Sequence, residues 1–208
     1  MTATAGRQRT QIPALAAGMY HAVCTMVIDL GIQCVPAFKM QKIHQVRILW
    51  EIAGQTIQIG DKEFPRQVSK DYTLSLSENS NLRKALESWR GAAFAEEDLQ
   101  GGFDFRKLCG VNGQLLMMPK PGKKGSYAAV SGIIPLQKGT PRVKPERTFY
   151  FDMEDPATYA VFEALPRYIQ EAIAQAENFA DTGLVLPQRA SSNAGDLSPE
   201  SCFGSSYA

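Results

Sequence analysis

The chain has 208 residues, and its 22 Lys and Arg residues nearly balance its 21 Asp and Glu residues, which gives a formal net charge of +1. With 17 Gly and 12 Pro residues it is too poor in these types for a low-complexity or collagen-like chain, and its length suffices for one core of moderate size or two small ones. No stretch reaches the ~18 apolar residues of a membrane span, and residues 1–10 lack the apolar region of a signal peptide. We therefore expect a cytoplasmic protein without a membrane segment.

The net charge conceals a strong asymmetry along the chain. Residues 1–150 hold 20 of the 22 basic and 12 of the 21 acidic residues, a net charge of +8, whereas residues 151–208 carry −7. Within the first part, residues 106–147 hold nine basic residues and one acidic residue. A basic body followed by an acidic region favours a polyanionic partner, although a distribution that only keeps the protein soluble remains the alternative.

Three strands are predicted in the first part of the chain, after a flexible arm at residues 1–16. The first covers Gly18–Gln33, where apolar residues recur on one parity from position 20 to position 30 and Asp29-Leu30-Gly31 permits a bend or bulge. The second and third strands, at 43–53 and 66–77, alternate apolar and polar residues, with Lys70 as the exception on the apolar parity of the third.

A change of pattern then indicates helices followed by two further strands. Asn79-Ser80 caps a predicted helix from Asn81 to Arg90, which ends at Gly91, and Leu82, Leu86 and Trp89 form its apolar face. A short acidic turn at 96–99 and a short helix at 105–109 follow. Strands are expected at 112–118 and 126–136, joined by a hairpin loop at 119–125 that carries three lysines.

The order of three strands, helices and two strands predicts a mainly β fold with α, namely an OB-fold-like five-stranded barrel over residues 17–137 with its helices between strands three and four. Another α+β or β-barrel arrangement with the same element order is the alternative. Residues 138–151 form a basic connector, residues 152–180 an acidic helical region, and residues 181–208, which are rich in Ser and Gly, a disordered tail.

No catalytic constellation stands out, so we expect a protein that is not an enzyme and needs no cofactor or metal. The four cysteines contain no C-x-x-C pair, and a zinc site built from His21, Cys24 and Cys34 would lack the usual paired spacing. Asp61, Glu63 and Lys70 could be read as a nuclease-like cluster, and a metal-dependent nuclease is therefore kept as an alternative function.

Binding of single-stranded nucleic acid requires aromatic rings for base stacking and a basic groove for the phosphates. The aromatic candidates are Tyr20, Phe38, Trp50, Tyr72 and Tyr127. The basic candidates lie on the second and third strands, in the two loops that an OB-fold uses for its ligand, and in the connector: Lys39, Lys42, Arg47, Lys70, Lys120, Lys123, Lys124, Lys138 and Arg142.

Some of these candidates also have a structural interpretation. Trp50 and Tyr72 share the apolar parity of their strands, which favours a core position over a stacking role for both. Arg47 lies on the parity opposite to Trp50 and is therefore the better groove candidate. The loop lysines could also be ordinary solvated turn residues.

Several segments resemble a known family. They are Ile28-Asp29-Leu30-Gly31, the strand ending in LWE at 49–51, SKDYTLSLSENSNLRKALESWRG at 69–91 and FDFRKLCGVNGQLLM at 103–117. Over residues 18–137 the chain resembles small proteins of phage and prophage replication modules that are regarded as OB-fold single-stranded DNA-binding proteins. The resemblance implies protection of single strands during replication or recombination in a bacterial host cell. Such proteins often end in an acidic tail, whereas residues 203–208 of this chain hold no acid.

The sequence therefore predicts a non-catalytic single-stranded DNA-binding protein that acts by phosphate neutralisation and base stacking. Residues 152–208 are expected to contact replication or recombination proteins, and a homo-oligomer is compatible with the sequence. The main alternative is a protein–protein interaction module that targets a host or replication factor.

Overall fold

The structure is a computed structural model that describes residues 15–35, 40–122 and 125–187. Six strands are present: β1 (Gly18–Val35), β2 (Gln41–Ile59), β3 (Lys62–Thr73), β4 (Asn112–Gly122), β5 (Gly125–Pro135) and β6 (Phe149–Phe151). The helices are α1 (Asn81–Arg90), α2 (Glu96–Gln100), α3 (Tyr159–Ala164) and α4 (Arg167–Ala174), with 3₁₀ turns η2 (Phe105–Leu108), η3 (Pro156–Thr158) and η4 (Phe179–Thr182). Residues 1–14 of the predicted arm and residues 188–208 of the predicted tail lie outside the described residues, as do Phe38, Lys39, Lys123 and Lys124.

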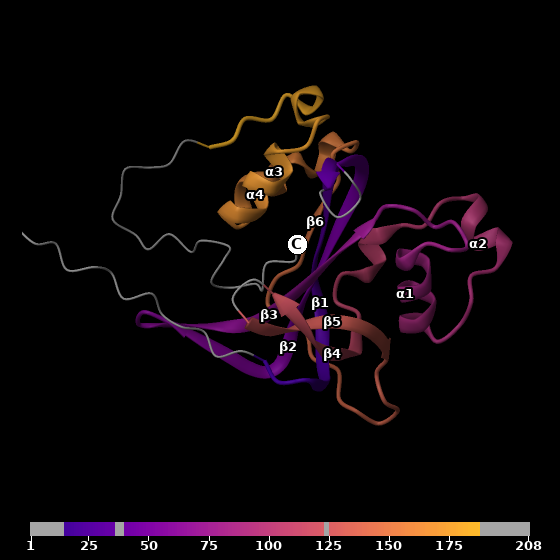
Figure 1. Cartoon of the computed structure of the whole chain (residues 1–208), viewed down its shortest axis with the longest axis vertical. Coiled ribbons are helices and arrows are strands. Elements are labelled where there is room, and N and C mark those ends of the chain that lie inside the picture. The colour runs from indigo at the N-terminus through magenta and orange to yellow at the C-terminus, as the bar shows by residue number, and fades with distance from the viewer. Residues whose placement is uncertain (1–14, 36–39, 123–124, 188–208) are drawn as a thin grey trace, which may run out of the picture.

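The prediction of a mainly β protein with helices is confirmed. Five strands form a sheet in the order β3-β2-β1-β4-β5, in which all neighbours are antiparallel, and β6 joins β1 in parallel. The helices α1 and α2 lie on one side of this sheet and α3 and α4 on the other (Figure 1). Within the described residues, no helix is long and apolar enough to cross a membrane.

The β2–β3 hairpin is longer than predicted. The sequence analysis ends its second strand at residue 53 and begins the third at 66, but the ladder continues through Thr56↔Pro65 to Ile59↔Lys62 after a register shift. Gly54, at φ +69°, lies within this irregular part of β2. It interrupts the alternation of apolar and polar residues, and the predicted strand therefore ends before it. The hairpin therefore turns tightly at Gly60, and β3 ends at Thr73 rather than at 77.

The long strand β1 serves three partners, and bulges make this possible. Residues Gly18–Val23 pair with β4, Ala22–Val35 pair with β2, and Met26–Ile28 also pair with β6. Register shifts fall between Cys24 and Met26 and at the predicted bend between Asp29 and Gly31. Each shift moves the following side chains to the other face of the sheet, since the side-chain period of a strand is two residues.

Two hydrophobic cores result from this change of face. The first lies under α1 and includes Ala22 and Cys24 of β1, together with Trp50 and Trp89, whose ring centroids are 5.8 Å apart. Helix α1 begins and ends as predicted, because the Ser80 side chain accepts the backbone N–H of Arg83 and Gly91 adopts a left-handed conformation.

The second core joins the acidic region of the chain to the sheet. Met26, Ile28 and Leu30 of β1, with Leu49 of β2, pack against apolar residues of the segment after residue 148, namely Phe151, Met153, Phe162, Leu165, Ile169, Ile173 and Ala176. The acidic helical region expected at 152–180 contains two short helices, α3 and α4, which are separated at Leu165-Pro166. Deeply buried side chains thus hold this acidic segment against β1 and β2.

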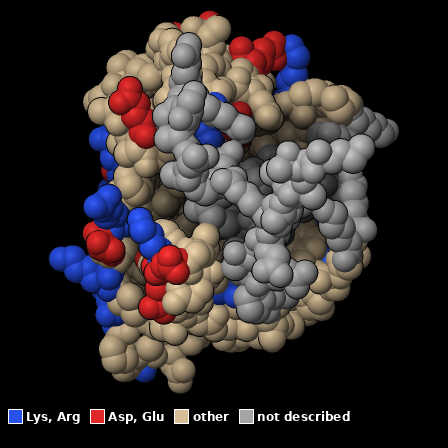
Figure 2. Space-filling model, turned by 90° about the vertical axis from the view of Figure 1, so that its left-hand side faces the viewer, with Lys and Arg blue, Asp and Glu red and all other residues tan. Residues whose placement is uncertain are grey.

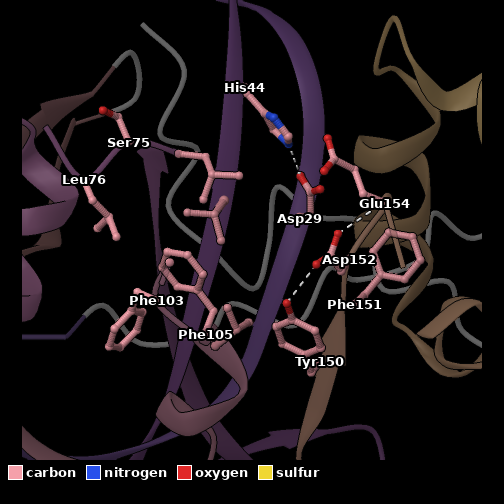
Figure 3. A pocket seen from close by; sticks show the side chains of 14 residues that line it. Asp29, His44, Ser75, Leu76, Phe103, Phe105, Tyr150, Phe151, Asp152 and Glu154 are labelled. Atoms are coloured by element: carbon pink, nitrogen blue, oxygen red, sulfur yellow. Dashed lines mark hydrogen bonds and ion pairs between the residues drawn. The ribbon is translucent and has the colours of Figure 1, made fainter. Parts of the chain in front are cut away.

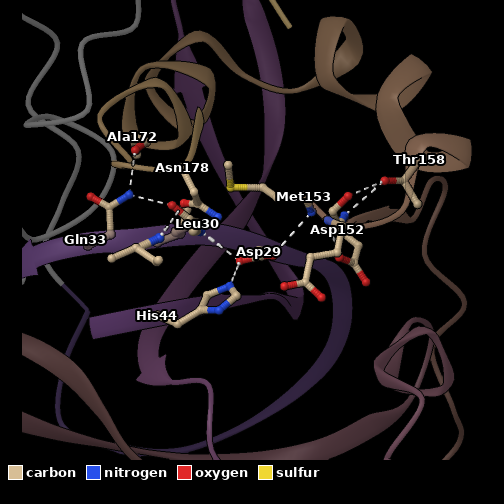
Figure 4. Close-up of polar contacts among 12 residues, drawn as sticks. Asp29, Leu30, Gln33, His44, Asp152, Met153, Thr158, Ala172 and Asn178 are labelled. Carbon is tan, nitrogen blue, oxygen red and sulfur yellow. Dashed lines mark hydrogen bonds and ion pairs between the residues drawn. The ribbon is translucent and has the colours of Figure 1, made fainter. Parts of the chain in front are cut away.

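The buried carboxylate of Asp29 connects strand β1 to the acidic segment (Figure 4). It accepts the backbone N–H of Gly31 at 2.8 Å and that of Met153 at 3.2 Å, and it lies 2.6 Å from Nε2 of His44. Farther along β1, the Asn178 side chain accepts the N–H of Ile32 at 2.9 Å. The bulge of β1 therefore provides the polar anchor of the C-terminal segment.

Candidate nucleic-acid interface

Two of the predicted stacking residues are core residues, which corrects the prediction for them. Trp50 is 1% exposed and Tyr72 is 3% exposed, and both pack in the core beneath α1. A base cannot reach either ring in this fold, and burial also raises the pKa of the Tyr72 hydroxyl. Their apolar parity had favoured the core interpretation from the start.

Arg47 does not offer a free charge to a ligand groove. Its guanidinium forms a bidentate pair with Asp71 on the neighbouring strand, at 2.6 and 2.8 Å, and the Arg47 side chain is only 11% exposed. Lys42 is exposed but pairs with Glu177 at 2.5 Å, which raises its pKa. Of these two cations of β2, one is therefore neutralised by β3 and the other by the acidic segment.

Three predicted residues do come together where β3 approaches β5. The half-buried Lys70 extends its Nζ to the carbonyl oxygen of Ser131 on β5, at 3.2 Å. Burial, and to a lesser extent the charge of Lys120, lowers the pKa of Lys70. Lys120 stands opposite Tyr127 in the β4–β5 ladder, and their side chains therefore share a face.

The fourth predicted aromatic residue, Tyr20, has a basic neighbour that the sequence analysis missed. The Tyr20 hydroxyl donates to the carbonyl oxygen of Ala16 at 3.0 Å, and Arg66 of β3 lies close enough for the two groups to interact. Burial lowers the pKa of Arg66. Arg66 has the same parity as Lys70 on β3, and this pattern could have identified it.

The outer face of β1, β4 and β5 carries an exposed apolar strip that was not predicted. Met19 stands opposite Leu116, and Met118 and Ile134 follow on the same face, with exposures between 36% and 48%. Lys120 and Tyr127 bound this strip at the hairpin end of β4. We call these six residues the β4–β5 face.

The basic connector lies at the other end of the same strand. Asn112 at the start of β4 fixes it: its Oδ1 accepts the N–H of Val143 at 2.8 Å, and its Nδ2 donates to the Val143 carbonyl at 2.9 Å. This contact builds an open pocket of 450 Å³ lined by Gly110, Asn112 and residues 142–148. Its charged lining residues are Arg142, Lys144 and Arg147 with a single acid, Glu146.

Of the two predicted connector residues, Arg142 thus lines a pocket, and Lys138 is exposed outside it. Lys144 and Arg147 belonged to the basic run recognised in the sequence but were not named as candidates. On the face seen in Figure 2, by contrast, acidic and basic side chains alternate along one edge and form no separate basic patch. The connector pocket is therefore a local concentration of positive charge.

The residues of the alternative metal sites are not brought together. Among the described residues, no group of three His, Cys, Asp or Glu side chains could hold a metal ion. His21 contacts Asn112 at 2.8 Å, and the thiol of Cys34 lies at Met40, near the opposite end of β1. Glu63 bonds to Thr56 in the β2–β3 hairpin, roughly 23 Å along β3 from Lys70 at the usual rise per residue.

No family model matches this chain, and no curated protein is similar to it.

Proposed function

We propose that this protein binds single-stranded DNA without catalysing a reaction, through an OB-like barrel. The strand order β3-β2-β1-β4-β5, the contact between β3 and β5, and the position of α1 between β3 and β4 in the chain support this barrel. Ser131 is the residue of β5 that the register shift leaves without a partner on β4. Its carbonyl oxygen accepts a hydrogen bond from the ammonium group of Lys70, so this side chain connects β3 to β5, the two outermost strands of the sheet.

The observation that carries the proposal is the β4–β5 face with a basic group at each end. Unpaired bases expose apolar faces that stack on apolar and aromatic side chains, while their phosphates need cations beside that surface. The exposed strip from Met19 to Ile134 supplies the first requirement. Lys120 at one end, and the pocket of Arg142, Lys144 and Arg147 at the other, supply the second.

This interface differs from the one expected on β2 and β3. The outer side of β2 is covered where Leu49 packs against the acidic segment, and Arg47 is paired. The proposed role is the protection of single strands during replication or recombination in the cytoplasm of a bacterial host, as the family resemblance implies.

A fluorescence titration with oligo-dT at several salt concentrations tests the proposal. Each phosphate neutralised on a single strand contributes about −0.7 to the slope of log K against log salt. Replacing Arg142, Lys144 and Arg147 by Ala should therefore flatten this slope by about 2. The matched control replaces Lys62, Lys84 and Lys107, three exposed cations outside the pocket, and should leave the slope unchanged.

A second variant tests the apolar strip separately from charge. Leu116→Ser with Met118→Ser should weaken oligo-dT binding about tenfold at an unchanged salt slope, because a stacked base contributes ~1–3 kcal/mol. Equal or tighter binding to duplex DNA would contradict the proposal. An unchanged affinity in both variants would show that the strip serves another contact, such as one between two copies of the chain.

A further inference from the structure

A second pocket, of 370 Å³, shares no residue with the β4–β5 face. It opens between β1, β2, the loop after β3, the loop before η2, and the segment that begins with β6 (Figure 3). Its volume falls within the range of ~300–1,000 Å³ that is usual for ligand pockets. Two walls of different chemistry face each other across it.

One wall is apolar and aromatic. The rings of Phe103 and Phe105 meet edge to face with centroids 5.1 Å apart, and Val46, Leu74 and Leu76 extend this wall. Phe103 also contacts Phe94, with ring centroids 5.4 Å apart, so the aromatic wall is supported from behind. This wall can take a bulky apolar side chain or a ring of a partner molecule.

The other wall is acidic. Asp29, Asp152 and Glu154 line it together with His44, and the Tyr150 hydroxyl donates to Asp152 at 2.9 Å. The hydrogen bond to Asp29, and the charges of Asp29, Glu154 and Asp152, raise the pKa of His44 despite its partial burial. The electrostatic potential at this wall is therefore negative.

One carboxylate of this wall is available to a partner. Glu154 is exposed, and its carboxylate forms no hydrogen bond or ion pair with the described part of the chain. In Figure 3 it lies beside Asp29 and His44. Asp29, by contrast, uses both of its oxygens within the fold.

One cation of the protein, Arg106, lies beside this wall without lining the pocket. Arg106 places its guanidinium 4.9 Å from the centroid of the Tyr150 ring and pairs with Asp155. Asp104 lies near as well, so the charged groups around Tyr150 remain mainly acidic. A phosphodiester chain would be repelled here, whereas an added Arg or Lys with an apolar neighbour would fit both walls.

We propose that this pocket docks a peptide segment of a protein partner in which a bulky apolar residue stands next to Arg or Lys. The apolar side chain packs on Phe103 and Phe105, and the basic group pairs with Glu154. Such a site is independent of the DNA-binding surface, so the protein can hold a single strand and a partner protein at once.

Selection of random peptides displayed on phage against the full-length protein tests this proposal. Selected peptides are then synthesised with a fluorescent label, and their affinities are measured by anisotropy. The expected peptides contain Arg or Lys beside an aromatic or large aliphatic residue, and Glu154→Lys should weaken their binding at least tenfold. Glu163→Lys, an exposed acid on α3, is the matched control and should change the affinity less than twofold.

Two further measurements sharpen the test. Phe105→Ala should weaken the same peptides, while circular dichroism confirms that each variant is folded. Three outcomes would overturn the proposal. The selected peptides could lack basic residues, their binding could be insensitive to Glu154→Lys, or no peptide could be selected at all. Oligo-dT should bind the Glu154→Lys and Glu163→Lys variants with equal affinity, since both make the same change of charge in the acidic segment. Competition between oligo-dT and the peptide would show that the pocket belongs to the DNA site instead.

Discussion

Removal of the Asp29 carboxylate should destabilise the protein strongly, because it leaves two buried donors without an acceptor. In Asp29→Ala the N–H groups of Gly31 and Met153 lose their partner, and both residues are buried. An unsatisfied buried donor costs ~1–3 kcal/mol, so the free energy of unfolding should fall by about 2–6 kcal/mol. In Asp29→Asn one carbonyl oxygen remains as an acceptor, and roughly half of this loss is expected.

The pH dependence provides an independent check on the same contact. Asp29 raises the pKa of His44 above its ordinary value of 6.5, so the folded state holds this proton more tightly than the unfolded state. The stabilisation is complete below pH 6.5 and is lost as the pH rises through the raised pKa. In Asp29→Asn, and in His44→Gln, this part of the pH dependence should disappear.

Urea unfolding followed by circular dichroism, at pH values from 6 to 9, measures both effects. His21→Gln serves as the control histidine, since its ring contacts Asn112 and not Asp29. A loss below about 1 kcal/mol in Asp29→Ala would refute the reasoning, because it would mean that water or another group satisfies the two donors. An unchanged pH profile in Asp29→Asn would refute the assigned role of His44.

Two other substitutions and one deletion have defined outcomes. Gly31→Ala should lower the melting temperature sharply, because φ is +69° and an added Cβ would stand 2.5 Å from Met153 Sδ. Trp50→Phe should reduce stability in thermal melts but change the oligo-dT affinity less than twofold, whereas a larger loss of affinity would restore its stacking role. Deletion of residues 151–208 should produce a protein that binds a hydrophobic dye and aggregates, since it uncovers Ile28 and Leu49.

The regular elements of the fold could be predicted because their local signals agree. Alternation located β1, β5 and the start of β2 within two residues, but not the end of β2, and Ser80 and Gly91 fixed both ends of α1. The charge run at 106–147 includes Arg142, Lys144 and Arg147, the three cations that line one pocket. These features depend on residues close together in the chain.

The faces of β1 could not be predicted in the same way. In the sequence, the even-numbered positions from 20 to 30 are all apolar, and this alternation predicted Cys24 and Leu30 on the same side of the sheet. The bulge between Cys24 and Met26 reverses the sides, so Cys24 lies in the first core and Leu30 in the second. The sequence indicated the bend between Asp29 and Gly31 but not the register shift between Cys24 and Met26. The choice of β2 and β3 as the ligand face rested on the expected OB-fold and not on the parity of β1.

The change of face along β1 also alters the interpretation of the opposite charges of residues 1–150 and 151–208. It buries apolar residues of the acidic segment against the sheet, so this segment is not a separate arm. A separate acidic arm could compete with DNA for a basic groove, and its deletion would then tighten DNA binding. In the structure the acidic segment is instead anchored by buried apolar residues and by Asp29, and it meets the basic part through Lys42–Glu177 and Arg106–Asp155. Deletion would damage the sheet, so it cannot isolate the effect of charge. Replacing exposed acids such as Glu163 and Glu177 by Gln keeps both cores intact, and competition predicts tighter oligo-dT binding at low salt, where screening is weak.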